Sequence, residues 1–290
     1  MNIRQSVRAG SFYDAPPEKC RRHAEDLLAQ ADLPKDLPPR LFGGLVPHAG
    51  WVFSGAVAAR TLKALAATGD VGTLVLFGAD HTGSVRHGEV YDSGAWNTPL
   101  GDVRIDEKLA AAILKSGDCL RANPGAHDFE HSIEVQVPLI QVLWPEAMIV
   151  PVAVPPSPLA GEVGRTVGWA LRQGFPRARV VGSTDLTHHG GHFGSPGGRG
   201  KAGVEWAEIN DRRMLDIIER MDAEAVVPEA QARQNSCGAG AIAAAIAACA
   251  EMGASRALVL QYTTSYRVMR ETYAGGLDYT TVGYASVVFA

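Results

Sequence analysis

Three histidines each follow an apolar run that ends in a polar, glycine-containing turn: His48, His81 and His188. The runs that precede them are predicted to be buried strands: Leu41 to Val46, Gly72 to Phe77 and Val180 to Asp185. In open α/β sheets, ligands bind at the carboxyl ends of the strands. We therefore expect the three imidazoles to meet in one pocket.

Cys237 adds a second kind of donor, because it begins an alanine-rich helical stretch, Ala239 to Ala250. The macrodipole at a helix N-terminus lowers the pKa of a thiol and favours the thiolate. Two histidines and one anionic ligand, with positions left open, form the ligand set of non-haem Fe(II) oxygenases. A thiolate in place of the carboxylate shifts the preference toward Cu(I) or zinc.

Each of these residues also has an ordinary structural interpretation. Cys237 fits a small buried apolar position, and Asp185 fits a turn or helix cap. Glu130 and Glu134 suit a helix N-terminus, where the dipole favours negative charge. A cysteine hydrolase is a further alternative, which requires the Cys237 thiolate to pair with a base.

Composition narrows the class of protein. The 290 residues carry a net charge of −4, with 46% hydrophobic and 20% charged residues, which is typical of a globular protein with a sizeable core. There is no basic footprint for nucleic acid, no apolar run long enough for a membrane span, and no signal peptide around Arg4 and Arg8. The four cysteines form no CxxC pair, so we expect a protein of the reducing cytoplasm.

Predicted strands alternate with predicted helices along the whole chain. This pattern indicates one α/β domain, residues 1–290, with a central mixed, mostly parallel sheet flanked by helices. We expect Ser132 to cap a helix, a glycine-rich surface loop from Gly190 to Gly203, and a further loop between final strands at Arg256 to Thr264 and Thr281 to Phe289.

Several motifs taken in order resemble the Memo family, called AmmeMemoRadiSam system protein B in bacteria and archaea. The resemblance covers nearly the whole chain. Its motifs here are Arg8-Ala9-Gly10-Ser11-Phe12-Tyr13, Val46-Pro47-His48-Ala49-Gly50, Gly78-Ala79-Asp80-His81, Glu130-His131-Ser132-Ile133-Glu134, Ser183-Thr184-Asp185-Leu186-Thr187-His188 and Ser236-Cys237-Gly238.

That family is similar in fold to class III (LigB-type) extradiol dioxygenases, which implies a metal pocket at one sheet edge. By resemblance His48 and His81 match the two ligand histidines, and Cys237 stands where those enzymes carry a glutamate. His131 and His188 resemble the two histidines that act on substrate and oxygen, with Asp185 close by. The resemblance implies iron(II) or copper, with zinc as a third candidate, and AMMECR1-like and radical-SAM partners.

These expectations leave two functions open. The first is a dioxygenase-like metal-dependent oxidoreductase acting on an unknown substrate, with His188 or His131 as general acid/base. The second is a non-catalytic protein that keeps the pocket for a peptide or partner, since Cys237 replaces the carboxylate of a ring-cleaving iron site. We also expect Asp80, which departs from the family's usual turn, to hydrogen-bond a ligand imidazole.

Overall fold

The computed structural model describes residues 2–191, 193–194, 197–272 and 279–290, and its centre is a mixed sheet. Within these residues the sheet has nine strands, in the order β10-β12-β2-β9-β3-β8-β4-β7, with β11 paired to β12. Its parallel core consists of β2 (Gly43–Val46), β9 (Ala178–Ser183), β3 (Thr73–Gly78) and β8 (Met148–Ala153). The predicted α/β class with a mixed, mostly parallel sheet is confirmed.

Antiparallel pairing appears on both sides of this core. On one side lie β12 (Thr281–Phe289), β11 (Ala257–Thr264) and β10 (His188–His189). On the other, β4 (Gly88–Val90) runs antiparallel to β8, and β7 (Leu120–Ala122) runs parallel to β4. A separate three-stranded sheet contains β1 (Ile3–Arg4), β5 (Ala95–Thr98) and β6 (Gly101–Arg104).

The register of three adjacent core strands determines where their side chains emerge. Leu45 of β2 pairs with Gly182 of β9, and Phe77 of β3 pairs with the same glycine. Because the strands are parallel and in step, β2, β9 and β3 end side by side at one edge. Every residue of β2 and β3 is buried, as expected for parallel strands that helices cover on both faces.

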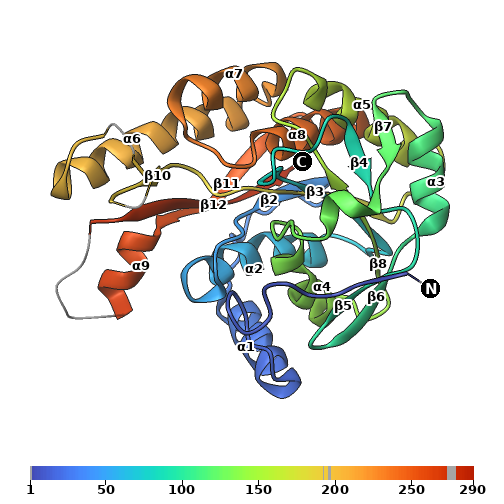
Figure 1. The fold of residues 1–290 in the computed structure, drawn as a ribbon, viewed down its shortest axis with the longest axis horizontal. Helices are drawn as coiled ribbons and strands as arrows, with labels where there is room; N and C mark the ends of the chain where they lie inside the picture. Colours follow the sequence, from blue (N-terminus) through green and yellow to red (C-terminus); the bar gives the residue numbers. More distant parts are fainter. Residues whose placement is uncertain (1, 192, 195–196, 273–278) are drawn as a thin grey trace.

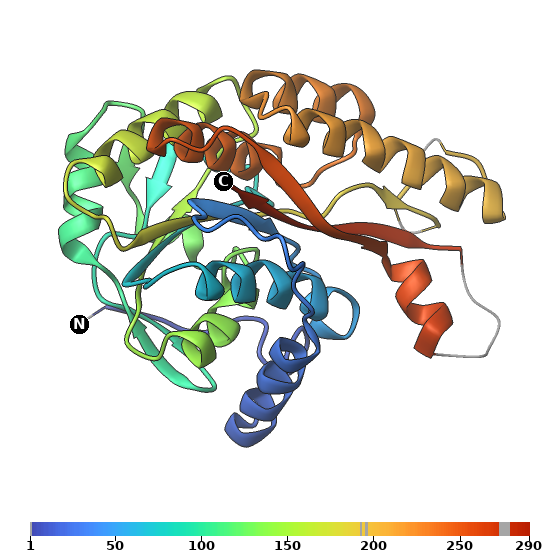
Figure 2. The same cartoon turned by 180° about the vertical axis from the view of Figure 1, so that it is seen from behind.

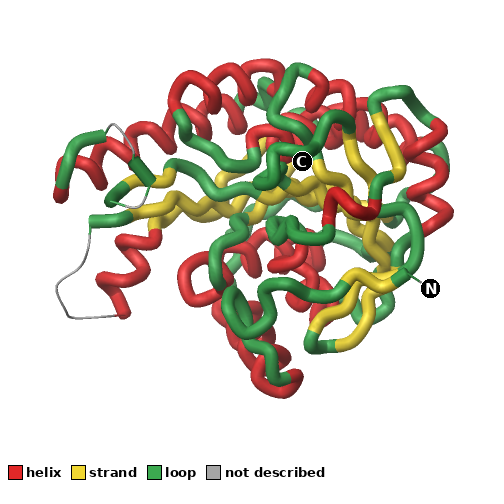
Figure 3. The backbone as a smooth tube through the Cα atoms, viewed as in Figure 1, coloured by secondary structure: helices red, strands yellow, loops and turns green. Residues whose placement is uncertain are grey.

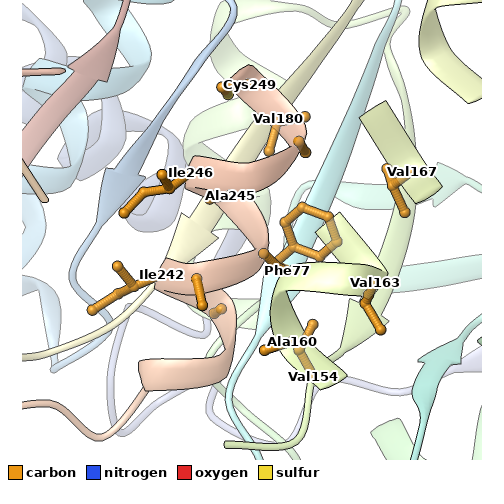
Figure 4. Packing of buried hydrophobic residues seen from close by; sticks show 14 of the residues in the cluster. Phe77, Val154, Ala160, Val163, Val167, Val180, Ile242, Ala245, Ile246 and Cys249 are labelled. Carbon is orange, nitrogen blue, oxygen red and sulfur yellow. The ribbon is translucent and has the colours of Figure 1, made fainter. Parts of the chain in front are cut away.

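Helices cover the two faces of the sheet (Figure 1). One face carries α5 (Leu159–Arg172), α7 (Ala223–Arg233) and α8 (Ala239–Met252); the other carries α1 (Pro17–Gln30), α2 (Trp51–Ala67) and α4 (Val137–Leu143). The alanine-rich α8 packs closely on α5. Gly164 of α5 permits this contact, because a Cβ at that position would overlap the backbone of Ala244. Figure 4 shows the core beneath them, where Phe77 and Val180 of the sheet lie beside α8.

The hairpin of β11 and β12 extends away from the main body, with α6 (Gly200–Glu219) on one side and α9 (Ser265–Thr272) on the other (Figures 2 and 3). The remaining elements are α3 (Glu107–Lys115) and two short 3-10 helices, η1 (Pro124–His127) and η2 (Glu134–Gln136). No helix of the described residues is long and apolar enough to cross a lipid bilayer.

The structure corrects some expected elements. Helix α7 was not predicted; Pro228 lies within it, and its N-cap is Asp222, which accepts a hydrogen bond from the Ala225 N–H. Helix α9 occupies the start of the segment expected to be a loop before β12. Of the two predicted loops, residues 192, 195–196 and 273–278 lie outside the described residues, and α6 begins at Gly200.

Two further corrections concern residues near the predicted site. Ser132 does not cap a helix; its hydroxyl accepts a hydrogen bond from the Ala79 N–H at 2.9 Å and so fixes the turn after β3. His188 does not simply follow the end of β9, because it starts β10 and pairs with Val282 of β12. The strand end at β9 delivers Asp185 instead.

Candidate metal centre

The shared edge of β2, β9 and β3 gathers the side chains that the sequence indicated. His48, Asp185 and His81 lie two or three residues beyond the ends of these strands. One ligand atom from each of His48, His81 and Cys237 lies within 4.8 Å of the other two. Two overlapping groups meet the same criterion: His81, Glu130 and His131, and Asp185, His188 and Cys237.

His48 is held in one tautomer by its neighbours. The Ser183 hydroxyl donates its only proton to the Ser132 carbonyl at 2.7 Å, so it must accept from His48 Nδ1 at 3.0 Å. The lone pair of His48 therefore resides on Nε2, which lies 3.2 Å from Cys237 Sγ. Burial, followed by the charge of His81, lowers the pKa of His48 well below its usual value, so this imidazole is neutral.

His81 is held by a carboxylate. Its Nδ1 lies 2.9 Å from Glu130 Oε1, and its backbone N–H donates to Glu130 Oε2 at 2.9 Å. Burial would lower the pKa of His81, but the hydrogen bond and charge of Glu130 raise it overall. A carboxylate on one ring nitrogen fixes the orientation of a metal-ligating histidine and raises its basicity.

The expected role of Asp80 is wrong. Its carboxylate accepts hydrogen bonds from the Thr82 hydroxyl and from the N–H groups of Ser84 and Val85, so it shapes the turn after His81. Glu130 bonds the imidazole instead. Sequence reasoning treated Glu130 only as a residue favouring a helix N-terminus, and the one indication of its function was the motif it shares with His131.

Cys237 lies in the turn before α8, and its backbone N–H donates to the Asp185 carbonyl at 3.2 Å. Desolvation, followed by the negative charge of Asp185, raises the pKa of the Cys237 thiol. The expectation that the helix dipole favours a thiolate is therefore wrong for the metal-free chain, because desolvation outweighs the dipole. A bound cation is what would stabilise the thiolate here.

The three residues predicted to act on substrate lie around the same centre. His131 stacks on His81 with ring centroids 4.7 Å apart, and burial lowers its pKa to about 4. His188 Nδ1 bonds the Leu186 carbonyl at 3.0 Å, which leaves Nε2 with the lone pair, and burial lowers its pKa. Asp185 accepts from the His48 N–H at 2.8 Å, and burial raises its pKa to about 7.

A cavity of about 640 Å³ opens onto these groups. Its polar lining includes His48, His81, His131, His188 and Asp185, and its apolar lining includes Phe12, Phe53, Phe193, Tyr266 and Tyr284. Apolar walls with a few convergent polar groups are typical of small-molecule sites. Cys237 is not among the described residues that line the cavity; it is half-buried, and its sulfur lies 3.2 Å from His48 Nε2.

One cavity wall comes from an N-terminal segment. The sequence alone did not indicate what anchors this segment. Glu134, fully buried, pairs with Arg4 at 2.8 Å and accepts from the Val7 and Arg8 N–H groups and the Tyr13 hydroxyl. These bonds hold residues 4–13, so that Phe12 contacts the His131 ring edge-on at 5.2 Å. The family motif from Arg8 to Tyr13 was the indication that this segment serves the site.

A mixed sheet with two oriented imidazoles and a thiol at its edge defines an α/β protein with a candidate metal-binding group. The model of the Memo-like protein family matches residues 4–288. A MEMO1 family protein of Methanopyrus kandleri is 38% identical over 298 residues, covering 99% of this chain and 98% of the relative. The corresponding protein of Methanothermobacter thermautotrophicus is 37% identical over 293 residues, covering 98% and 99%. The chain belongs to the Memo family.

Proposed function

We propose that this Memo family member binds one transition metal through His48, His81 and Cys237 and uses it in an oxidoreductase reaction on a small molecule held in the cavity. One observation carries the proposal: both histidines have Nδ1 committed to a fixed acceptor, Ser183 or Glu130. In each imidazole Nε2 is consequently the ring nitrogen left to bind a metal, and the donor atoms lie within 4.8 Å of each other.

The donor set fits particular metals. Two imidazoles with one thiolate suit copper, iron(II) and zinc, and suit magnesium or calcium poorly. Of these, iron(II) and copper supply one-electron chemistry and coordination of O₂ or substrate when bound. We propose one of these two as the working metal, with zinc as a third candidate.

The chain's own residues would bind the substrate and move protons. The aromatic walls, Phe12, Phe53 and Tyr284 among them, would contact the apolar part of a substrate. His131 and His188 are neutral near pH 7 and can each accept a proton. Asp185 has a pKa of about 7, so it can hold or release a proton at the operating pH.

A cysteine hydrolase is less well supported. His48 Nε2 lies within 3.2 Å of Cys237 Sγ, as a base would. However, the sulfur does not reach the cavity lining among the described residues, and the pKa of the thiol is raised. A nucleophile needs a usable thiolate, and the raised pKa of Cys237 disfavours one in the metal-free site.

A non-catalytic binding protein is the second candidate, and the presence of cysteine in place of a carboxylate favours it. In that case the cavity would bind a peptide or a partner, such as the AMMECR1-like or radical-SAM proteins implied by the family's system name. Catechol turnover by the purified Fe(II)-loaded protein would exclude this alternative.

The test is metal content by mass spectrometry after anaerobic purification, comparing wild type with Cys237→Ala and His48→Ala. Cys249→Ala is the matched control, because Cys249 is a buried cysteine in the core. We expect near-stoichiometric iron or copper in the wild type and the control, and none in the two site variants. A folded wild type that cannot take up Fe(II), Cu(I) or Zn(II) would overturn the proposal.

A further inference from the structure

Two adjacent polar side chains of α6, Asn210 and Asp211, are almost completely buried outside the cavity lining. The Asp211 carboxylate forms no ion pair with the part of the chain that the structure describes. Burying such a group without a cation is costly. The hydrogen bonds that this carboxylate accepts are therefore expected to have a specific role.

Asp211 holds the loop that leads to His188. Its Oδ1 accepts from the Thr187 N–H at 2.7 Å, and its Oδ2 accepts from the Tyr262 hydroxyl at 2.6 Å. The approach requires glycine at 283 on β12, because a Cβ there would overlap the carboxylate. Gly283 in turn exchanges backbone hydrogen bonds with Leu186 and Thr187. The residue before His188 is thereby fixed to both α6 and β12.

Asn210 connects this loop to the segment that carries Cys237. Its Nδ2 group has two protons; one goes to Thr187 Oγ1 at 3.1 Å and the other to the Arg233 carbonyl at 2.9 Å. The Asn210 backbone carbonyl accepts from Asn235 Nδ2 at 3.1 Å. Asn235 is fully buried and lies two residues before Cys237. Asn210 therefore bonds both the loop before His188 and the segment before Cys237.

We infer that Asn210 and Asp211 are positioning residues that set the placement of His188 relative to Cys237. The inference rests on the proposed metal site and extends it to α6. Residues that orient ligands from behind typically change metal affinity 10–100-fold when they are removed. Asn210→Ala removes the side-chain bonds to Thr187 and to the Arg233 carbonyl, so it loosens the loop before His188 and the segment before Cys237 together, while the backbone bond to Asn235 remains.

The first experiment uses Co(II) as the probe, because thiolate ligation gives Co(II) a charge-transfer absorption. We expect Asn210→Ala to weaken Co(II) binding by about tenfold and to shift this absorption, with the far-ultraviolet circular dichroism unchanged. Ile209→Ala, at an exposed neighbour on the same helix, is the matched control and should leave both unchanged. A folded Asn210→Ala with wild-type affinity and spectrum contradicts the inference.

A second readout needs no metal. In the metal-free protein, alkylation of Cys237 by iodoacetamide, followed by peptide mass spectrometry, should be several-fold faster in Asn210→Ala than in wild type, with Cys249 unchanged. If Asn210→Ala does not fold, Thr187→Val removes only the receiving hydroxyl and should give the same change to a smaller extent. Equal Cys237 alkylation in folded variants overturns the inference whether or not the wild type binds Co(II).

Asp211 offers a test by rescue. Asp211→Asn keeps an oxygen that can accept from the Thr187 N–H, whereas Asp211→Ala does not. We expect Asp211→Asn to retain the wild-type Co(II) spectrum and Asp211→Ala to lose it. If both variants retain the wild-type Co(II) spectrum, the bond from Thr187 to Asp211 has no positioning role. If the wild type binds no Co(II), the proposed metal site has failed, and the alkylation assay then decides the positioning role independently.

Discussion

The two halves of the candidate metal centre hold their donors by different means. His81 has a side chain 32% exposed to solvent and is anchored by a carboxylate, which raises its pKa. His48 is buried and anchored by a hydroxyl, and Cys237 beside it has a raised pKa, so both are neutral without metal. The His81 half is thus stabilised by the charge of Glu130 before any metal binds. The donors of the His48 and Cys237 half gain a charged partner only when a cation binds.

The largest effect should come from the neutral half. Cys237→Ser replaces the soft donor with a hydroxyl that does not ionise near pH 7, so Cu(I) affinity should fall by more than the roughly 10–100-fold that loss of a supporting residue costs. Competition with a Cu(I) chelator measures this change. Cys119→Ser, a change at a buried cysteine away from the site, should bind as wild type does. Undiminished Cu(I) binding by Cys237→Ser would mean that the thiolate is not a ligand.

The charge-stabilised half is tested by its anchor. Glu130→Gln keeps an acceptor for His81 Nδ1 but removes the charge that raises the imidazole's pKa. We expect metal affinity to fall by about 10–100-fold. Ser183→Ala removes the neutral anchor of His48, and its loss of metal affinity should lie nearer the lower end of that range. If the two variants lose affinity equally, the difference between the halves does not matter for binding.

The comparison also predicts how the metal-free protein responds to pH. His81 has a raised pKa, so its stabilising contribution is present below pH 6.5 and is lost as the pH rises through the raised value. Asp185, with its pKa raised to about 7 from 3.8, lowers stability progressively between pH 3.8 and about 7, where only the unfolded chain ionises, and adds no further change above that range. His48 and His131 have lowered pKa values, so their contributions are lost as the pH falls below 6.5.

Stability without metal should therefore be greatest near pH 6.5 and fall toward higher pH. Each kcal/mol corresponds to about 2–4 °C in Tm for a protein of around this size. Thermal unfolding across this range measures the trend, and Glu130→Gln, which removes the charge that raises the pKa of His81, should flatten its alkaline side. Stability that rises steadily above neutral pH would contradict the assignment of these protonation states.

The smallest effect is expected from Asp80→Asn. Asp80 shapes the turn after His81 and does not contact the imidazole. Metal affinity should stay within about twofold of wild type, a change of under roughly 0.5 kcal/mol, because asparagine keeps a side-chain oxygen that can accept hydrogen bonds of this turn. Isothermal titration calorimetry of metal binding to Asp80→Asn and to Glu130→Gln measures the difference between the two variants. A loss as large as that of Glu130→Gln would return Asp80 to the role first expected of it.

The donors could be located from the sequence because the ends of buried strands can be recognised in it. The apolar runs before His48 and His81 end in turns, and the parallel sheet places both turns at one edge. It could not identify which distant side chain anchors which imidazole, because Glu130 and Ser183 reach their partners through tertiary packing. The protonation of Cys237 was misjudged for the same reason: local helix position is visible in a sequence, whereas desolvation is not.

The anchoring of residues 4–13 by Glu134 has a consequence for how the site forms during synthesis. Its components enter from widely separated parts of the chain: Phe12 early, Glu134 in the middle, then Cys237 and Tyr284 much later. Ribosomes release segments in order, and early domains fold first. Here the early segment must wait for the last strand before the cavity closes. The cavity beside the candidate metal centre is therefore complete only once the last strand has been synthesised.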